Sequence, residues 1–170
     1  MLSNEVLVEA FKRVQGVVHF ALDGASVELL TYRPDAEANT IAWLVWHLTR
    51  GQDDHIADLM GEEQVWIAGG WVDRFDLPFD PGATGYGQSS EDVAGVRADA
   101  EVLALYYDAV HTRTVDYVFT LKDADYARIV DESWNPPVTL AVRLISILAD
   151  NLQHAGQASY ARGLATRAGS

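Results

Sequence analysis

The chain of 170 residues contains no cysteine. A disulfide framework, a cysteine-based zinc site and an internal thiol nucleophile are therefore excluded, and any thiol chemistry needs a thiol from a second substrate. Because 49% of the residues are hydrophobic, a complete core can form without disulfides. The length corresponds to one ordinary domain, and we predict a single domain over residues 1–170.

Long apolar segments are also missing, since no uninterrupted hydrophobic run is long enough to span a membrane. The first residues mix Glu5, Glu9, Lys12 and Arg13 with apolar positions, which is not the pattern of a signal peptide. We therefore expect a cytoplasmic protein with no membrane partner.

Basic residues are few. Lysine and arginine number 12 against 25 acidic residues, which gives a formal net charge of -13. A duplex phosphate backbone repels such a surface, and binding it normally takes a stripe of basic side chains. We predict that nucleic acids are not partners of this protein.

Apolar residues recur at three- and four-residue steps in four segments, as is typical of amphipathic helices. The predicted helices cover roughly residues 4–30, 40–61, 90–120 and 138–165. Asn39 or Thr40 is the predicted N-cap of the second helix, and Ser89 or Ser90 that of the third. No segment shows the alternating pattern of a strand. The sequence therefore predicts an all-α fold, an antiparallel four-helix bundle.

Residues 62–89 lack a regular pattern and are rich in glycine and proline. Disordered segments are poor in aromatic residues, so the aromatic side chains here favour a packed loop with a short helical turn around Trp71 to Phe75. Loops of this length in compact domains are usually functional. We predict a crossover or lid whose aromatics serve as hydrophobic anchors, as substrate contacts or as both: Trp66, Trp71, Phe75 and Tyr86.

Three side chains have the chemistry of metal ligands. His47 lies on the second predicted helix, and Asp150 and His154 lie four residues apart on the last. Two imidazoles and a carboxylate inside a bundle would form a three-ligand site with open coordination positions. Simpler interpretations exist: Asp150 and His154 as a solvated pair on a helix surface, and His47 as a core histidine that donates to a backbone carbonyl.

Other residues of the second helix lie near His47 in helical phase, namely Trp43, Gly51 and Asp54. Asp53 and Asp54 are interpreted as exposed carboxylates. His55 falls on the apolar stripe eight residues after His47, so we interpret it as a buried or interfacial histidine and keep it as a reserve ligand.

Two helical segments resemble the DinB/YfiT-like family. The run from Asn39 to Leu48 is similar to the family's pattern Asn-Ser/Thr-Ile-x-Trp-x-x-x-His-Leu. The run from Asp150 to Gln157 is similar to its last helix, where His or Glu is followed, after three residues, by His-x-Gly-Gln. The segment from Trp71 to Glu91 resembles the branch that includes the mycothiol-dependent maleylpyruvate isomerases.

This resemblance implies a DinB-like bundle in which His47, Asp150 and His154 correspond to the family's metal ligands. Aspartate is one methylene shorter than the family's glutamate, so Asp150 would bind at longer range, through a water, or not at all. The donor set suits zinc or nickel, and also manganese or ferrous iron. Candidates for orienting the ligands by hydrogen bonds are Ser146, Asn151 and Gln157.

The resemblance further implies a metal-dependent transferase or isomerase that activates a small thiol of the mycothiol type toward an electrophilic substrate. A divalent ion with an open position lowers the pKa of a thiol, and the same ion would activate water in a hydrolase. The alternative is a non-catalytic bundle that binds a metal or ligand in a stress response. Family members often pair through bundle faces, so we also expect a homodimer.

Overall fold

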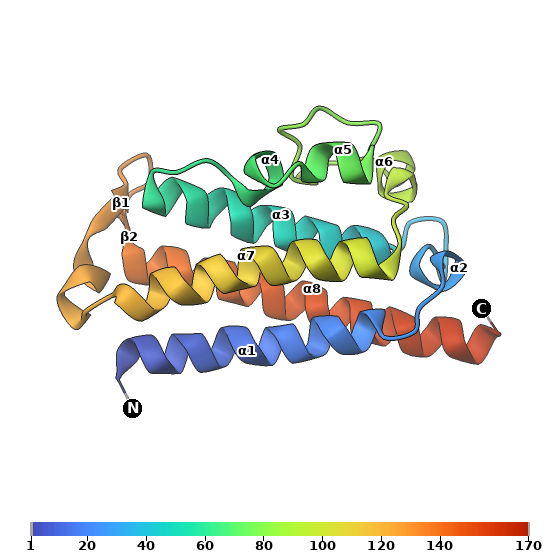
Figure 1. The fold of residues 1–170 in the computed structure, drawn as a ribbon, viewed down its shortest axis with the longest axis horizontal. Coiled ribbons are helices and arrows are strands. Elements are labelled where there is room, and N and C mark those ends of the chain that lie inside the picture. Colours follow the sequence, from blue (N-terminus) through green and yellow to red (C-terminus); the bar gives the residue numbers. More distant parts are fainter. Residues whose placement is uncertain (1, 170) are drawn as a thin grey trace.

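The computed structural model of the protein describes residues 2–169. Four long helices lie side by side along its longest axis (Figure 1): α1 (Ser3–Leu22), α3 (Ile41–Met60), α7 (Ala100–Thr120) and α8 (Leu140–Ala168). Helices α1 and α8 run in one direction and α3 and α7 in the other. Both α1 and α3 pack against α7 and α8, so α1 and α3 occupy opposite corners. The predicted all-α bundle is confirmed.

Shorter elements connect these helices: α2 (Val27–Leu30), α4 (Val65–Ala68), α5 (Trp71–Phe75), α6 (Ser90–Gly95) and the 3-10 helix η1 (Asp123–Ala127). Strands β1 (Ile129–Asp131) and β2 (Val138–Thr139) form an antiparallel pair that the sequence did not predict, because both are too short for an alternating pattern. The helical turn at Trp71 to Phe75 is confirmed.

Two predicted helices differ in extent from the structure. The first ends at Leu22 because Gly24 takes a positive φ of 59°, and the chain continues into the separate α2. The third is divided, since α6 ends at Gly95 and α7 begins at Ala100. Of the alternative N-caps, Thr40 and Ser89 are the ones used, because their side chains accept hydrogen bonds from backbone N–H groups.

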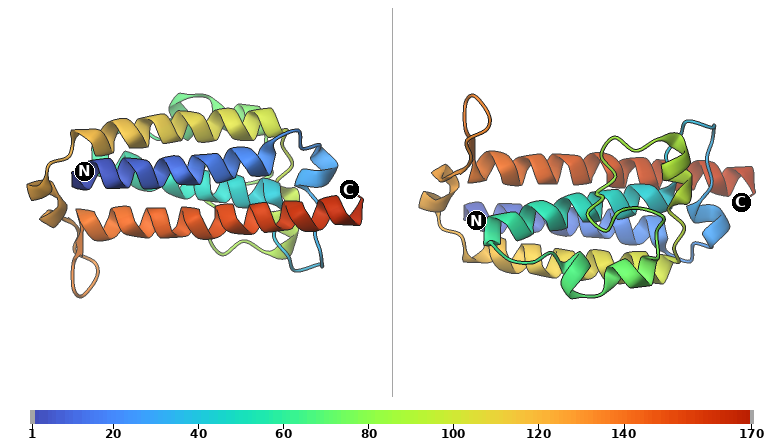
Figure 2. Two further views of the ribbon diagram at one scale, coloured as in Figure 1. Left: turned by 90° about the horizontal axis from the view of Figure 1, so that it is seen from below. Right: turned by 90° about the horizontal axis from the view of Figure 1, so that it is seen from above.

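Residues 62–89 form the crossover that returns the chain along the bundle, since α3 and α7 run in the same direction (Figures 1 and 2). Trp66, Trp71 and Phe75 are buried and pack against Tyr106 of α7, with ring centroids 5.2, 5.4 and 5.7 Å from it. These three side chains are hydrophobic anchors that hold the crossover on the core, which is one of the two roles predicted for the loop aromatics.

A buried polar network ties the crossover to α3. Asp53 is 1% exposed and accepts hydrogen bonds from the backbone N–H groups of Val65 and Trp66, at 2.9 and 2.7 Å. The Tyr106 hydroxyl donates to the same carboxylate at 3.0 Å. Arg50, also buried, donates to the Ala83 carbonyl at 3.0 Å. The prediction of Asp53 as exposed is wrong, because the crossover covers that side of α3.

Helix length and composition also bear on membranes. Among residues 2–169, no helix combines the length and the apolar character that crossing a bilayer requires.

Candidate metal centre

His47 of α3 and Asp150 and His154 of α8 meet where these two helices pack together. One potential ligand atom from each lies within 4.8 Å of the others, and within residues 2–169 this is the only such group of three or more. Nε2 of His154 is 3.4 Å from Oδ1 of Asp150. The two imidazole centroids are 4.9 Å apart with the rings at 71°. The structure therefore brings together the three residues nominated from the sequence.

His47 is held in place by groups on two sides of its ring. Its Nδ1 donates to the Thr84 carbonyl at 2.6 Å. The indole of Trp43 stacks on the imidazole with centroids 4.6 Å apart, and the indole N–H donates to Gln88 at 2.7 Å. The bond to Thr84 fixes the tautomer and leaves Nε2 free as a ligand atom. His47 is thus a histidine bonded to a backbone carbonyl and also a potential metal ligand.

His154 is oriented in the same way by a side chain of its own helix. Its Nδ1 lies 2.9 Å from Oε1 of Gln157, which leaves Nε2 facing Asp150. This is the orienting role predicted for Gln157. Ser146 instead donates to the backbone carbonyl of Val142, and Asn151 donates to the side chain of Gln52.

The donor set fits a divalent ion. Two ligands about 2.0–2.1 Å from a zinc ion, at a tetrahedral angle, are about 3.3 Å apart. The separation of 3.4 Å between His154 Nε2 and Asp150 Oδ1 agrees with that spacing. Two imidazole nitrogens with a carboxylate suit zinc and other first-row divalent ions. The three residues would therefore hold such an ion with further coordination positions open.

The two histidines have opposite electrostatic surroundings. Burial lowers the pKa of His47, and this exceeds the opposing effect of the hydrogen bond to Thr84. The hydrogen bond to Asp150 raises the pKa of His154, and the same bond lowers the pKa of Asp150. The attraction between His154 and Asp150 is therefore lost as pH rises through the pKa of His154, and also as pH falls through that of Asp150.

We expect an NMR titration of the metal-free protein to show that the pKa of His47 is lower than that of His154. His47 should lose its proton below the ordinary histidine pKa and His154 above it. Replacement of Asp150 by asparagine should lower the midpoint of His154, because its charged hydrogen-bond partner is gone. Equal midpoints for the two histidines in the unmodified protein would contradict the described geometry.

A cavity of about 400 Å³ opens beside the triad. Its lining includes several residues predicted near the site, namely Gly51, Asp54, His55, Ser146 and Asn151. Thr84 and Tyr86 of the crossover complete it, so Tyr86, which is largely exposed, is the one predicted lid residue that lies at the site. His55 is partly exposed and lies 4.0 Å from Asp54, outside the triad.

Two features of this site were missed from the sequence. Gln52 is buried, accepts from Asn151 and donates to Thr114 at 2.6 Å, which links α3, α7 and α8 beneath the cavity. Gly85 has a φ of 97°, and a Cβ there would lie 2.6 Å from Nδ1 of His47. Glycine is therefore required where the crossover backbone meets the imidazole.

Replacement of Gly85 by alanine is expected to weaken metal binding by about 10- to 100-fold, the usual effect of losing an orienting hydrogen bond. The added methyl group must displace either the crossover or His47, which breaks the bond to Thr84. Gly87→Ala is the matched control, because Gly87 also has a positive φ but its Cβ would meet no atom within 4 Å. Calorimetric titrations measure the zinc affinity of both variants. Equal affinities would refute the role of Gly85 in keeping the hydrogen bond between Thr84 and His47.

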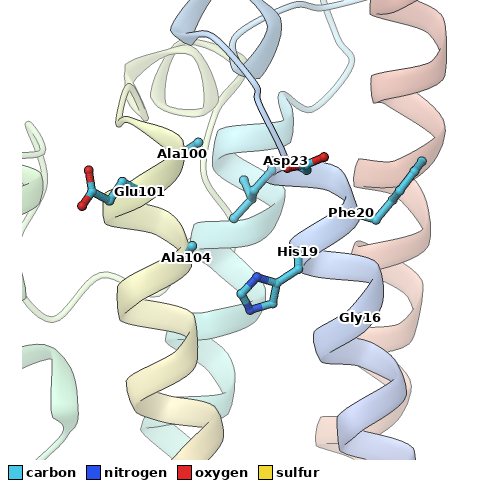
Figure 3. Close-up of a pocket in the computed structure, with 8 residues that line it drawn as sticks. Gly16, His19, Phe20, Asp23, Ala100, Glu101 and Ala104 are labelled. Carbon is cyan, nitrogen blue, oxygen red and sulfur yellow. The ribbon is translucent and has the colours of Figure 1, made fainter.

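A larger hollow of about 530 Å³ lies between α1 and α7. His19 points into this gap while Glu101 points away from it (Figure 3). The nearest polar partner of His19 is Asp108, at 2.8 Å. Because no three ligand atoms converge here among the described residues, cavity size alone does not locate the metal chemistry.

Comparison with known proteins agrees with this geometry. Residues 10–158 match the sequence model of the DinB superfamily. The chain belongs to the DinB superfamily. A crystal structure described as a conserved protein from Enterococcus faecalis is similar to it, with a TM-score of 0.91 and 28% sequence identity over 98% of each chain. No curated protein matches. In this DinB superfamily chain, the residues nominated by resemblance are the ones that the fold brings together.

Proposed function

We propose that this protein is a divalent-metal-dependent enzyme, a transferase or isomerase that uses a small thiol of the mycothiol type as cosubstrate. The observation that supports this is a three-ligand cluster beside a cavity of about 400 Å³. Catalytic metal sites characteristically have three protein ligands and an open position, whereas structural sites are closed. Zinc and nickel are the ions proposed.

The ion, when bound, would supply the positive charge that lowers the pKa of a thiol and favours its nucleophilic thiolate form. The thiol comes from a cosubstrate because the chain has no cysteine. His47 and His154 would hold the ion through Nε2, oriented by Thr84 and Gln157. Asp150 would add a negative charge to the donor set.

The cavity supplies groups for proton transfer and substrate orientation. Burial, and then the charge of Arg143, lower the pKa of His55, so its imidazole is neutral near pH 7 and able to accept the proton that a thiol releases. The hydroxyl of Ser146 and the carboxylate of Asp54 line the same cavity. Ile147 adds an apolar surface, and Tyr86 at the rim is placed to contact an incoming electrophile.

Cobalt(II) provides a spectroscopic test of this proposal. We expect one cobalt ion per chain, and addition of N-acetylcysteine should produce a thiolate-to-cobalt charge-transfer band in the near ultraviolet. Mycothiol should give the same band, and the metal-loaded protein should accelerate conjugation of that thiol to an electrophile. The control is His154→Ala, which should give neither band nor activity.

The other outcomes separate the competing interpretations. Cobalt binding without a spectral change on thiol addition would reject the thiol cosubstrate and favour a metal-dependent hydrolase or a non-catalytic bundle. Failure to bind cobalt, zinc or nickel would reject the metal-dependent enzyme itself.

A further inference from the structure

A buried relay of hydrogen bonds beneath the cavity runs in one direction. The Thr114 hydroxyl donates to the Val110 carbonyl at 2.8 Å, so its oxygen can only accept from Gln52. Gln52 donates to that oxygen through Nε2 at 2.6 Å and turns Oε1 toward Asn151, whose Nδ2 donates to it. Thr114, Gln52 and Asn151 are each at most 1% exposed. Because these side chains are shielded from water, the direction of the relay is preserved.

The direction of the relay decides which atom Asn151 presents to the cavity. The oxygen and the nitrogen of an amide point apart, so an Nδ2 directed at Gln52 leaves Oδ1 as the free end of the side chain. Within residues 2–169 no group donates to Oδ1, and protein atoms do not enclose it, since Asn151 lines the cavity. An acceptor on a buried residue is normally paired. Oδ1 therefore lacks a donor that a ligand in the cavity can supply.

Asn151 lies next to the proposed metal centre. It directly follows Asp150 on α8 and precedes His154 by slightly less than one helical turn. Asn151 also lines the same cavity as Asp150 and His47. A molecule that binds the ion through its first atom therefore extends into the cavity past Asn151. The unpaired Oδ1 is thus placed to contact a ligand of the ion, in addition to holding Gln52.

The rest of the cavity wall has the same polarity. The Ser146 hydroxyl donates to the Val142 carbonyl at 2.9 Å, so toward the cavity it can only accept. The carboxylate of Asp54 is also an acceptor. Neutral His55 and the Tyr86 hydroxyl can each donate one hydrogen bond, and no lysine or arginine lines the cavity in the described part of the chain. The wall is therefore complementary to a ligand that carries hydrogen-bond donors.

We propose that Asn151 is a specificity-determining residue, whose Oδ1 accepts a hydrogen bond from an amide N–H or a hydroxyl close to the sulfur of the thiol cosubstrate. Gln52 and Thr114 are positioning residues, because they fix the orientation of the Asn151 amide without supplying that contact. The inference rests on the proposed function, since it takes a metal-bound thiol as the ligand. A thiol without such a donor leaves Oδ1 unpaired and places its own acceptor against it, and sites built around a hydrogen bond reject analogues of that kind.

A matched pair of small thiols tests the proposal on the unmodified protein. N-acetylcysteamine and 2-mercaptoethyl acetate have the same shape, but an ester oxygen replaces the amide N–H in the second. Titration of the cobalt-loaded protein, followed by the thiolate-to-cobalt band, measures the affinity for each thiol after correction for the pKa of the free thiol. The amide should bind about 10- to 100-fold more tightly. The longer pair, N-(3-mercaptopropyl)acetamide and 3-mercaptopropyl acetate, extends the reach of the donor, and equal affinities within both pairs would overturn the proposal.

Three variants show whether Asn151 is the source of this preference. Asn151→Leu should bind the amide and the ester equally. Thr114→Val, a change outside the cavity, should reduce the preference because Gln52 loses the acceptor that orients it. Gln153→Leu is the matched control, since Gln153 is an exposed amide on the same helix that donates to the Ala149 carbonyl. It should keep the full preference. Circular dichroism and the cobalt content per chain check that each variant folds and binds the ion.

The ratio of the two affinities separates this proposal from a structural role and from the proposed function. A variant that only loosens the cavity weakens the amide and the ester alike and leaves the ratio unchanged. An undiminished preference in Asn151→Leu, or tighter binding of the ester by the unmodified protein, would overturn the proposal. A band of equal affinity for amide and ester overturns this inference alone. Absence of a band with every thiol overturns it together with the proposed thiol cosubstrate.

Discussion

Replacement of Asp53 by alanine is expected to lower the free energy of unfolding by about 3–5 kcal/mol, the usual cost of removing one member of a buried ion pair. Asp53 accepts hydrogen bonds from Val65, Trp66 and Tyr106, and Arg50 lies 3.9 Å away. The variant leaves two backbone N–H groups and a hydroxyl without their acceptor in the core, and it removes the carboxylate that lies beside the buried Arg50 guanidinium. Burial, with a further contribution from Asp53, raises the pKa of Tyr106, so that its hydroxyl stays protonated as a donor.

Urea denaturation followed by circular dichroism measures this loss. The neighbouring carboxylate gives the matched control, because Asp54 is 44% exposed and accepts one hydrogen bond, from Gln64. Asp54→Ala should cost at most about 1 kcal/mol. A similar decrease in the free energy of unfolding for Asp53→Ala and Asp54→Ala would show that the buried network does not hold the crossover on the bundle. Because the crossover carries Thr84, we also expect Asp53→Ala to weaken metal binding.

Removal of the His154 imidazole is expected to reduce zinc affinity by more than about 100-fold, or about 2.7 kcal/mol of binding free energy. Loss of an orienting group alone lowers metal affinity by about 10- to 100-fold. Because His154 would be a direct ligand, its removal should lower the affinity further. His154→Ala also leaves Asp150 without its hydrogen-bond partner. Competition with a chromophoric chelator measures the affinity of the variant and of the unmodified protein.

His55→Ala is the control for this prediction, since His55 lines the cavity but does not belong to the triad. Its zinc affinity should stay within a few-fold of that of the unmodified protein. A large loss in His55→Ala together with a small loss in His154→Ala would make His55 the ligand. Asp150→Asn, which keeps the side-chain shape and removes the charge, should give an intermediate loss if the carboxylate contacts the ion.

The local sequence determined the parts of this protein that depend on helical period and on capping. The four long helices follow from apolar residues at three- and four-residue steps, and Thr40 begins α3 because its hydroxyl accepts from a backbone N–H. His47, Asp150 and His154 were nominated from residue type, spacing and resemblance. Their convergence follows once α3 and α8 pack side by side.

Tertiary structure decided the features that depend on where the crossover lies. Asp53 and Asp54 are adjacent and chemically equivalent, yet only Asp53 is buried and bonded to the backbone of the crossover, whereas Asp54 is 44% exposed and accepts one hydrogen bond from the side chain of Gln64. Similarly, nothing local to Gly85 shows that His47 lies against it, because the bond between Thr84 and His47 joins residues 37 positions apart. Helical period describes one element at a time. The path of an irregular segment, and with it the hydrogen bond that orients His47, is set by packing between elements distant in sequence.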